Sequence, residues 1–119
     1  MKTKSSLILL TMMLLAACGS NAGPTPAGTL PPIQSGKAKV SIANFAFDPV
    51  ALTITTGTTV TWTNNDTVAH NVLSDDGSWG SNSLAKGDSF SFTFTKSGTF
   101  SYHCGVHPTM KATIIVVAP

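Results

Sequence analysis

Alternation of large apolar residues with polar or small ones is the feature of this sequence that most limits its fold. Between residues 37 and 119 the alternation recurs in short runs: Val40 and Ile42, Leu52 and Ile54, Val60 and Trp62, Phe90 to Phe94, and Phe100 to Cys104. A period of two residues is typical of strands that bury one face, and no stretch shows a helical period. Turn residues such as Gly57 and Gly77 separate the runs. We therefore predict an all-β sandwich of about seven or eight short strands.

The first 17 residues differ from the rest of the chain. Lys2 and Lys4 precede an apolar run without charge over residues 7–15. This pattern is typical of a secretory signal, and the run is shorter than the roughly 20 residues that a helix needs to cross a bilayer. We therefore expect residues 1–17 to direct export and to be removed, and we expect no permanent transmembrane helix.

The signal ends in Leu15-Ala16-Ala17-Cys18, which resembles the bacterial lipobox. The cysteine of a lipobox is lipidated and becomes the first residue of the mature protein. The alternative is an ordinary cleavage site with Cys18 as a bystander, and lipidation is the preferred hypothesis. More than one acyl chain would hold the protein stably on a membrane. The resemblance implies a lipoprotein that is anchored to a membrane and faces the periplasm or the cell exterior.

Residues 18–36 are predicted to carry the lipid and to act as a tether. The segment from residue 19 to residue 36 contains four Gly, four Pro and no charge, a composition typical of linkers. Residues 37–119 are then the single folded domain. Without residues 1–17, the five remaining lysines and the five aspartates cancel. This balance excludes nucleic-acid binding through a basic surface, and it gives a partner no strong charge to follow.

Side chains that bind metals gather near the C-terminus. Cys104, His107 and Met110 are three residues apart, so a short loop after a strand can turn them toward one point. His70 would have to come from another strand. Two imidazoles, a thiolate and a weak thioether are the ligand set of a blue copper site, whereas zinc normally prefers ligands harder than methionine. The sequence therefore predicts one copper ion bound by His70, Cys104, His107 and Met110.

Each of these side chains has a simpler explanation when it is taken alone. A single cysteine is most often a buried apolar thiol, a methionine a core residue, and a histidine a surface or hydrogen-bonded group. Cys104 is the one cysteine of the predicted folded domain. Outside the cytoplasm an unliganded thiol is open to oxidation, so metal ligation explains the presence of Cys104 better than packing does.

Several motifs accompany the four candidate ligands, in residues 57–62, 70–72, 92–94, 98–100 and 102–110. With these motifs, residues 39–117 resemble the cupredoxin family of type 1 copper proteins. Among its subgroups the amicyanins are most similar, because they share the short Cys-x-x-His-x-x-Met loop, whereas plastocyanins and pseudoazurins have two more residues before the methionine. The resemblance implies a Greek-key sandwich with copper at one end. It makes His70, Cys104 and His107 the equatorial ligands and Met110 the axial one.

The resemblance also implies roles for residues around the ligands. Asn71 would link its strand to the backbone near Cys104 and hydrogen-bond near the sulfur, which stabilises ligand geometry. The alternative is a structural asparagine in a turn. An apolar patch around the exposed edge of His107 would receive redox partners, and it would consist of Val68, Ala69, Val106 and Pro108.

Two further residues are not predicted to bind the metal. Successive side chains of a strand point to opposite faces, so His103 points away from Cys104, and we expect it at the surface or hydrogen-bonded. Trp79 lies in a segment rich in Gly and Ser, residues 75–89, which departs from the amicyanin pattern. Trp79 is either an exposed contact residue or, as we favour, a side chain folded onto the sandwich.

The implied function is transfer of single electrons by a monomer that cycles between Cu(I) and Cu(II). Its partners would be redox proteins, such as an amine dehydrogenase and a c-type cytochrome. A copper ion with only protein ligands has no position open to a substrate, so we do not expect an enzyme. The alternative is a module that stores or delivers copper with the same ligands. An enzyme with Cys104 as nucleophile and His107 as base is a weaker hypothesis, because Met110 would have no role.

Overall fold

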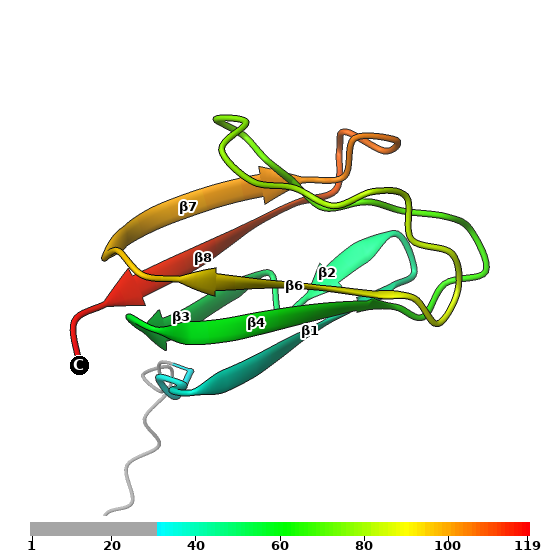
Figure 1. The fold of residues 1–119 in the computed structure, drawn as a ribbon. Helices are drawn as coiled ribbons and strands as arrows, with labels where there is room; N and C mark the ends of the chain where they lie inside the picture. Colours follow the sequence, from blue (N-terminus) through cyan, green and yellow to red (C-terminus); the bar gives the residue numbers. More distant parts are fainter. Residues whose placement is uncertain (1–30) are drawn as a thin grey trace, which may run out of the picture. The chain divides into compact units, whose positions relative to one another are not determined.

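The computed structural model describes residues 31–119, so the predicted signal, Cys18 and most of the predicted tether lie outside the described residues. The described part contains eight strands and no helix (Figure 1). The strands are β1 (Lys37–Ala43), β2 (Ala46–Asp48), β3 (Ala51–Thr55), β4 (Thr58–Asn64), β5 (Leu73–Ser74), β6 (Ser89–Phe94), β7 (Gly98–His103) and β8 (Lys111–Val117). Within residues 31–119 there is accordingly no helix that could span a membrane. The predicted all-β sandwich is confirmed.

The strands form two four-stranded sheets, one in the order β2-β1-β4-β6 and the other in the order β3-β8-β7-β5. Both sheets are mixed, because β1 pairs with β4 and β3 pairs with β8 in parallel, whereas the other pairs are antiparallel. The inward side chains of the two sheets form one apolar core, as expected for face-to-face packing. Its members include Val40, Ile42, Val60, Trp62 and Phe94 from the first sheet and Leu52, Ile54, Tyr102, Ile114 and Val116 from the second.

Strand β4 shows why the alternation in the sequence predicted this arrangement. Its residues are buried and half-buried in strict turn, with Val60 and Trp62 inside. The outward hydroxyl groups of β4 pair with those of β6: Thr59 with Thr93 at 2.7 Å, Thr61 with Ser91 at 2.7 Å, and Thr63 with Ser89 at 2.8 Å. Apolar residues therefore fill one face of the strand, and polar residues that satisfy one another cover the other face.

The connections place three segments at one end of the sandwich. Strand β4 ends at Asn64, and the register pairs this residue with Ile42, just before the hairpin that joins β1 to β2. At the same end β7 finishes at His103, which lies opposite Leu73 and Lys111. The hairpin, the segment after β4 and the loop between β7 and β8 thus lie together (Figure 1). All four predicted ligands come from the last two of these segments.

The segment before β1 is attached to the other end of the sandwich. The N–H of Gln34 donates to the carbonyl of Thr53 at 3.0 Å, and the N–H of Thr55 donates to the carbonyl of Gln34 at 2.9 Å. Gln34 therefore bridges to the edge strand β3, although residues up to 36 were predicted to belong to the tether. A bridge of one residue leaves no periodic pattern in a sequence. Lys37 pairs with Thr59 near the start of β4, about 17 Å from the end of that strand at 3.3 Å per residue.

Candidate metal centre

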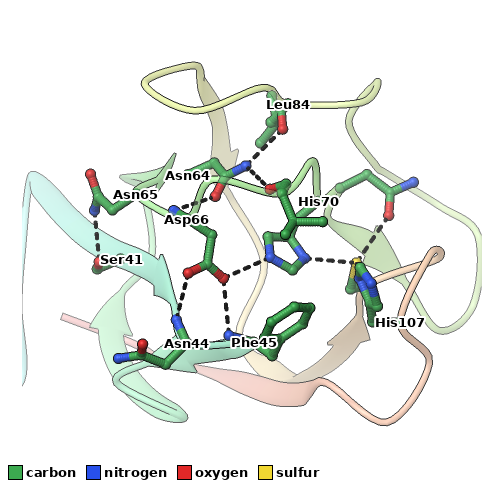
Figure 2. Close-up of polar contacts among 12 residues, drawn as sticks. Ser41, Asn44, Phe45, Asn64, Asn65, Asp66, His70, Leu84 and His107 are labelled. Carbon is green, nitrogen blue, oxygen red and sulfur yellow. Dashed lines mark hydrogen bonds and ion pairs between the residues drawn. The ribbon is translucent and has the colours of Figure 1, made fainter.

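Three of the predicted ligands converge at the end of the sandwich. The Sγ atom of Cys104 lies 3.7 Å from Nδ1 of His70 and 3.8 Å from Nδ1 of His107 (Figure 2). Their ligand atoms all lie within 4.8 Å of one another, and His70 and Cys104 are fully buried. These separations are those expected for ligands that each lie about 2.0 to 2.3 Å from one shared ion. The cluster therefore fits a single metal ion with nitrogen and sulfur ligands.

The loop between β7 and β8 holds two of these ligands and Met110. Strand β7 ends one residue earlier than predicted, at His103, and Cys104 begins the loop. The N–H of Cys104 donates to the carbonyl of Met110 at 3.0 Å, and the N–H of Met110 donates to the carbonyl of His107 at 2.9 Å. The loop is thus closed by its own backbone. Met110 is buried at the end of this loop, just before β8, and its role as the axial ligand stays a prediction.

Three hydrogen bonds fix the position of His70. Its backbone exchanges two hydrogen bonds with Leu84, at 3.1 and 2.7 Å. Its Nε2 lies 2.8 Å from Oδ2 of Asp66, so an Nε2–H donates to the carboxylate and leaves Nδ1 free on the side of Cys104. The N–H of Phe45 and then that of Asn44, together with the His70 ring, hold the pKa of Asp66 below its ordinary value. Asp66 is therefore an anion that orients this candidate ligand.

Asn64 organises the segment that carries Asp66 and His70. Its side-chain amide donates to the carbonyl of Val68 at 2.9 Å and to that of Leu84 at 2.8 Å. Its Oδ1 accepts the N–H of Asp66 at 2.9 Å. Asn64 is fully buried, its bond to Leu84 is buried and the other two are partly buried, and together they fix the path of the chain from β4 to His70.

Asn71 connects the His70 segment to the cysteine loop. Its Oδ1 accepts the N–H of Gly105 at 2.6 Å and lies 3.5 Å from Sγ of Cys104. A Cβ atom on Gly105 would lie 2.6 Å from Leu73 Cδ1 and 3.1 Å from Asn71 Nδ2, so only glycine fits without displacement. These are the two contacts that the family resemblance implies for Asn71.

Phe45 closes the centre on the side of the β1–β2 hairpin. Its ring meets His70 edge to face at a centroid distance of 5.4 Å, and it meets His107 in the same way at 5.1 Å. Phe45 is 51% exposed, and Val68 and Val106 near the histidines are 40% and 56% exposed. Buried ligands therefore lie directly beneath an apolar surface.

The two residues not expected to bind metal lie apart from the cluster. Nδ1 of His103 lies 2.6 Å from Oδ1 of Asp75 in a half-exposed pair, as expected for a histidine on the outer face of β7. Trp79 packs on the core and stacks against Phe92 at a centroid distance of 5.1 Å, so the preferred prediction for this side chain is confirmed.

Asp66, Phe45 and Asn64 were not among the residues predicted to form the site. Residues 64–66 are three polar side chains in a row, a composition that is typical of a turn and does not by itself indicate a metal centre. A carboxylate four residues before a candidate histidine ligand was the available signal for Asp66. No signal pointed to Phe45, because a large aromatic residue is unusual in the tight turn where it lies.

Comparison with known proteins decides the family. The sequence matches the family model of the cupredoxin-like domain over residues 6–116. The chain belongs to the cupredoxin family. This cupredoxin is 32% identical to the amicyanin of Paracoccus denitrificans over an alignment of 120 positions, gaps included. The alignment covers 90% of this chain and 92% of that protein. The resemblance inferred from the motifs is thus confirmed.

Solved structures agree with this assignment. A purple cupredoxin from Nitrosopumilus maritimus is similar with a TM-score of 0.63 and 33% identity, covering 67% of this chain and 99% of its own. A copper-containing nitrite reductase from Thermus scotoductus is similar with a TM-score of 0.65 and 28% identity. That match covers 83% of this chain but 26% of the reductase, so cupredoxin folds also occur as parts of enzymes.

Proposed function

We propose that this cupredoxin is a type 1 copper protein that transfers single electrons. His70, Cys104 and His107 would be the equatorial ligands and Met110 the axial one. The observation that carries the proposal is the convergence of two imidazole nitrogens on one buried thiol, with separations of 3.7 and 3.8 Å. When bound, copper supplies the one-electron Cu(I)/Cu(II) couple.

The surrounding residues hold the ligands rigidly. Asp66 and the Leu84 backbone fix His70, and Asn71 fixes the backbone next to Cys104. A site whose ligands cannot move far keeps one geometry in both oxidation states, which lowers the reorganisation that accompanies electron transfer. His70 and Cys104 are fully buried, which keeps water from the sulfur. The chain therefore fixes the geometry of the ligands and excludes water from the site.

His107 offers the route to a partner, because it is the half-buried member of the cluster. The apolar patch proposed around it consists of Val68, Ala69, Val106 and Pro108, and its exposed members include Val68 and Val106. Phe45 extends this patch on the hairpin side. We propose redox proteins as partners, with an amine dehydrogenase as donor and a c-type cytochrome as acceptor. Docking would be apolar, since the mature chain carries no net charge.

We propose a carrier rather than an enzyme. Four ligands from one chain leave no position at the ion for a substrate. Storage or delivery of copper with the same ligands is the second candidate function, and it is favoured by the partial exposure of His107, through which an ion could leave. Reversible voltammetry with fast electron self-exchange distinguishes the carrier from the store.

We also propose that the protein is an exported lipoprotein with Cys18 as its lipidated residue. The support is the sequence: a basic start, an apolar run over residues 7–15 and the lipobox-like residues up to Cys18. The proposed organisation is a signal of residues 1–17, a lipidated tether of residues 18–36 and a cupredoxin domain of residues 37–119. Mass spectrometry of membrane fractions should find acyl chains on Cys18, and C18A should release the protein from membranes.

Copper loading tests the proposed site. The purified protein with one equivalent of Cu(II) should develop an intense visible absorption from thiolate-to-copper charge transfer. Cys104→Ser should abolish this band, and Met110→Leu should keep the colour but shift the reduction potential, since the axial ligand tunes it. A colourless wild-type copper complex would overturn the proposal. A thiol alkylator that still modifies Cys104 in the copper-loaded protein would instead favour a nucleophilic cysteine.

A further inference from the structure

We propose that Phe45 is a positioning residue for the metal centre, whose ring, held in place by Asp66, keeps the imidazole of His107 directed at Cys104. This inference deepens the proposed function and rests on it. It assigns a task to a hairpin that contributes no ligand.

The backbone at Phe45 is unusual. Asn44 and Phe45 form the two-residue connection between β1 and β2, where Ala43 pairs with Ala46. Both have positive φ angles, 52° for Asn44 and 56° for Phe45, as in a type I′ turn. Asparagine tolerates this conformation, but the second position normally holds glycine, because the Cβ of other residues crowds the backbone. A phenylalanine here is disfavoured by local sterics, so its presence calls for another explanation.

Asp66 supplies the interactions that hold this turn. Its Oδ1 accepts the N–H of Asn44 at 2.7 Å, and its Oδ2 accepts the N–H of Phe45 at 3.0 Å. The same Oδ2 lies 2.8 Å from Nε2 of His70. One carboxylate thus ties the disfavoured turn to a metal ligand, as Figure 2 shows. The turn and the ligand are fixed relative to each other.

The Phe45 ring contacts both histidines. Its plane is inclined by 86° to the His70 ring and by 84° to the His107 ring, and the two imidazole centroids are 4.9 Å apart. Edge-to-face contacts of this kind stabilise aromatic pairs beyond simple burial. The ring therefore bridges the two ligands on the side away from the interior.

His107 needs this support more than His70 does. Hydrogen bonds to Leu84 and Asp66 hold His70, whereas in the described part of the chain the His107 ring has a polar contact only with the Cys104 sulfur. Pro108 follows it in a short loop. Packing must therefore set the angle of the His107 ring, and Phe45 is the aromatic neighbour from outside the ligand cluster.

Replacement by glycine separates the two roles that Phe45 can have. Phe45→Gly relieves the positive φ angle and removes the ring. If Phe45 only completes the turn, this substitution should raise the stability and leave the metal centre unchanged. If Phe45 positions His107, the substitution should loosen the His107 ring. Asn44→Gly is the matched control, because it relieves the neighbouring positive φ angle and leaves both aromatic contacts in place.

The experiment has one readout without copper and one with it. In the metal-free protein, NMR should show contacts from the Phe45 ring to both imidazoles, and Phe45→Gly should broaden the His107 ring signals while the melting temperature does not fall. With copper, release of Cu(I) to a chelator should be about three- to tenfold faster in Phe45→Gly, the size expected from lost aromatic contacts. Phe45→Tyr should restore both values, and Asn44→Gly should match the wild type in both.

Unchanged His107 signals and an unchanged rate of Cu(I) release in Phe45→Gly would overturn the inference. The two proposals can fail separately. A wild-type protein that forms no coloured copper complex would contradict the proposed function, and the metal-free NMR measurement would still decide whether Phe45 orders His107.

Discussion

The carboxylate of Asp66 lies 2.8 Å from Nε2 of His70, the buried imidazole four residues further along the chain. A second carboxylate–histidine pair, Asp75 with His103 at 2.6 Å, lies on the outer face of β7 and contacts no candidate ligand. The first pair orients a metal ligand and the second does not. Substitutions in the two pairs can therefore be compared to measure how much such a pair contributes to metal binding.

Asp66→Ala should weaken copper binding by about tenfold to a hundredfold, the usual effect of removing a group that orients a histidine ligand. Asp75→Ala should leave the affinity within about twofold of the wild type. Competition with a copper chelator measures both variants under the same conditions. Equal losses in the two variants would show that the Asp66 carboxylate has no special role at the site.

Gly105→Ala should disturb the environment of the cysteine sulfur. Gly105 has no positive φ angle, so the effect would come from space alone. The new Cβ would lie 3.1 to 3.2 Å from the Asn71 amide and 2.6 Å from Leu73 Cδ1. The Leu73 side chain can rotate away, but the Asn71 amide must move from its hydrogen bond with Gly105.

The measurement for Gly105→Ala is the visible absorption of the Cu(II) protein. We expect the thiolate-to-copper band to shift and to lose intensity. Leu73→Ala in the same background should not restore it, because the Asn71 contact remains. Full recovery in this double variant would assign the effect to Leu73 and not to Asn71.

The two adjacent isoleucines of β8 test the core. Ile114 is fully buried between the sheets, whereas Ile115 faces outward and is half-buried. Ile114→Val should lower the free energy of unfolding by about 0.5 to 1.5 kcal/mol, and Ile115→Val should change it by less than about 0.5 kcal/mol. Urea unfolding of the metal-free variants measures the difference. Similar losses at both positions would contradict the assigned orientation of β8.

Asp76 makes stability depend on acidity. The hydroxyl of Ser74, then the hydroxyl and N–H of Ser78, lower the pKa of Asp76 to about 2. A carboxyl whose pKa is lower in the folded state stabilises the fold above its unfolded pKa of about 3.9, and this contribution is lost as the pH falls through the folded value. The relevant window is therefore about pH 4 to 2.

The stability advantage of the wild type over Asp76→Asn should thus be present at pH 6 and should shrink as the pH approaches 2. Thermal unfolding of the two metal-free proteins across this range measures it. Asp48→Asn is a useful control, because no side-chain hydrogen bond holds that carboxylate among the described residues. A difference between wild type and Asp76→Asn that does not change with pH would refute the role of the Ser74 and Ser78 contacts.

The strands and the ligand loop could be predicted because their signals are local. Burial alternates along β4 from Thr58 to Asn64, and the same alternation is visible in the sequence. Cys104, His107 and Met110 share one short loop, so their spacing alone indicates a common target. Local patterns of this kind do not depend on how distant parts of the chain meet.

The groups that support the ligands could not be predicted, because they depend on contacts between distant segments. Asp66 bonds to Asn44 and Phe45 more than 20 residues earlier in the chain. The parallel pairing of β1 with β4 creates this contact by bringing Ile42 opposite Asn64. Phe45 also violates a local rule, since its φ angle is positive, and a reading of turn propensities would have placed glycine there.

The bridge between Gln34 and β3 decides which end of the domain the N-terminal segment occupies. The chain enters the domain at the pole opposite to the cysteine loop, since Gln34 lies beside Ile54 and Lys37 lies beside Thr59, both remote from His70. The described residues before β1 therefore leave the end that carries the cysteine loop uncovered. A partner of any size can therefore approach the histidines without displacing the segment that leads into β1.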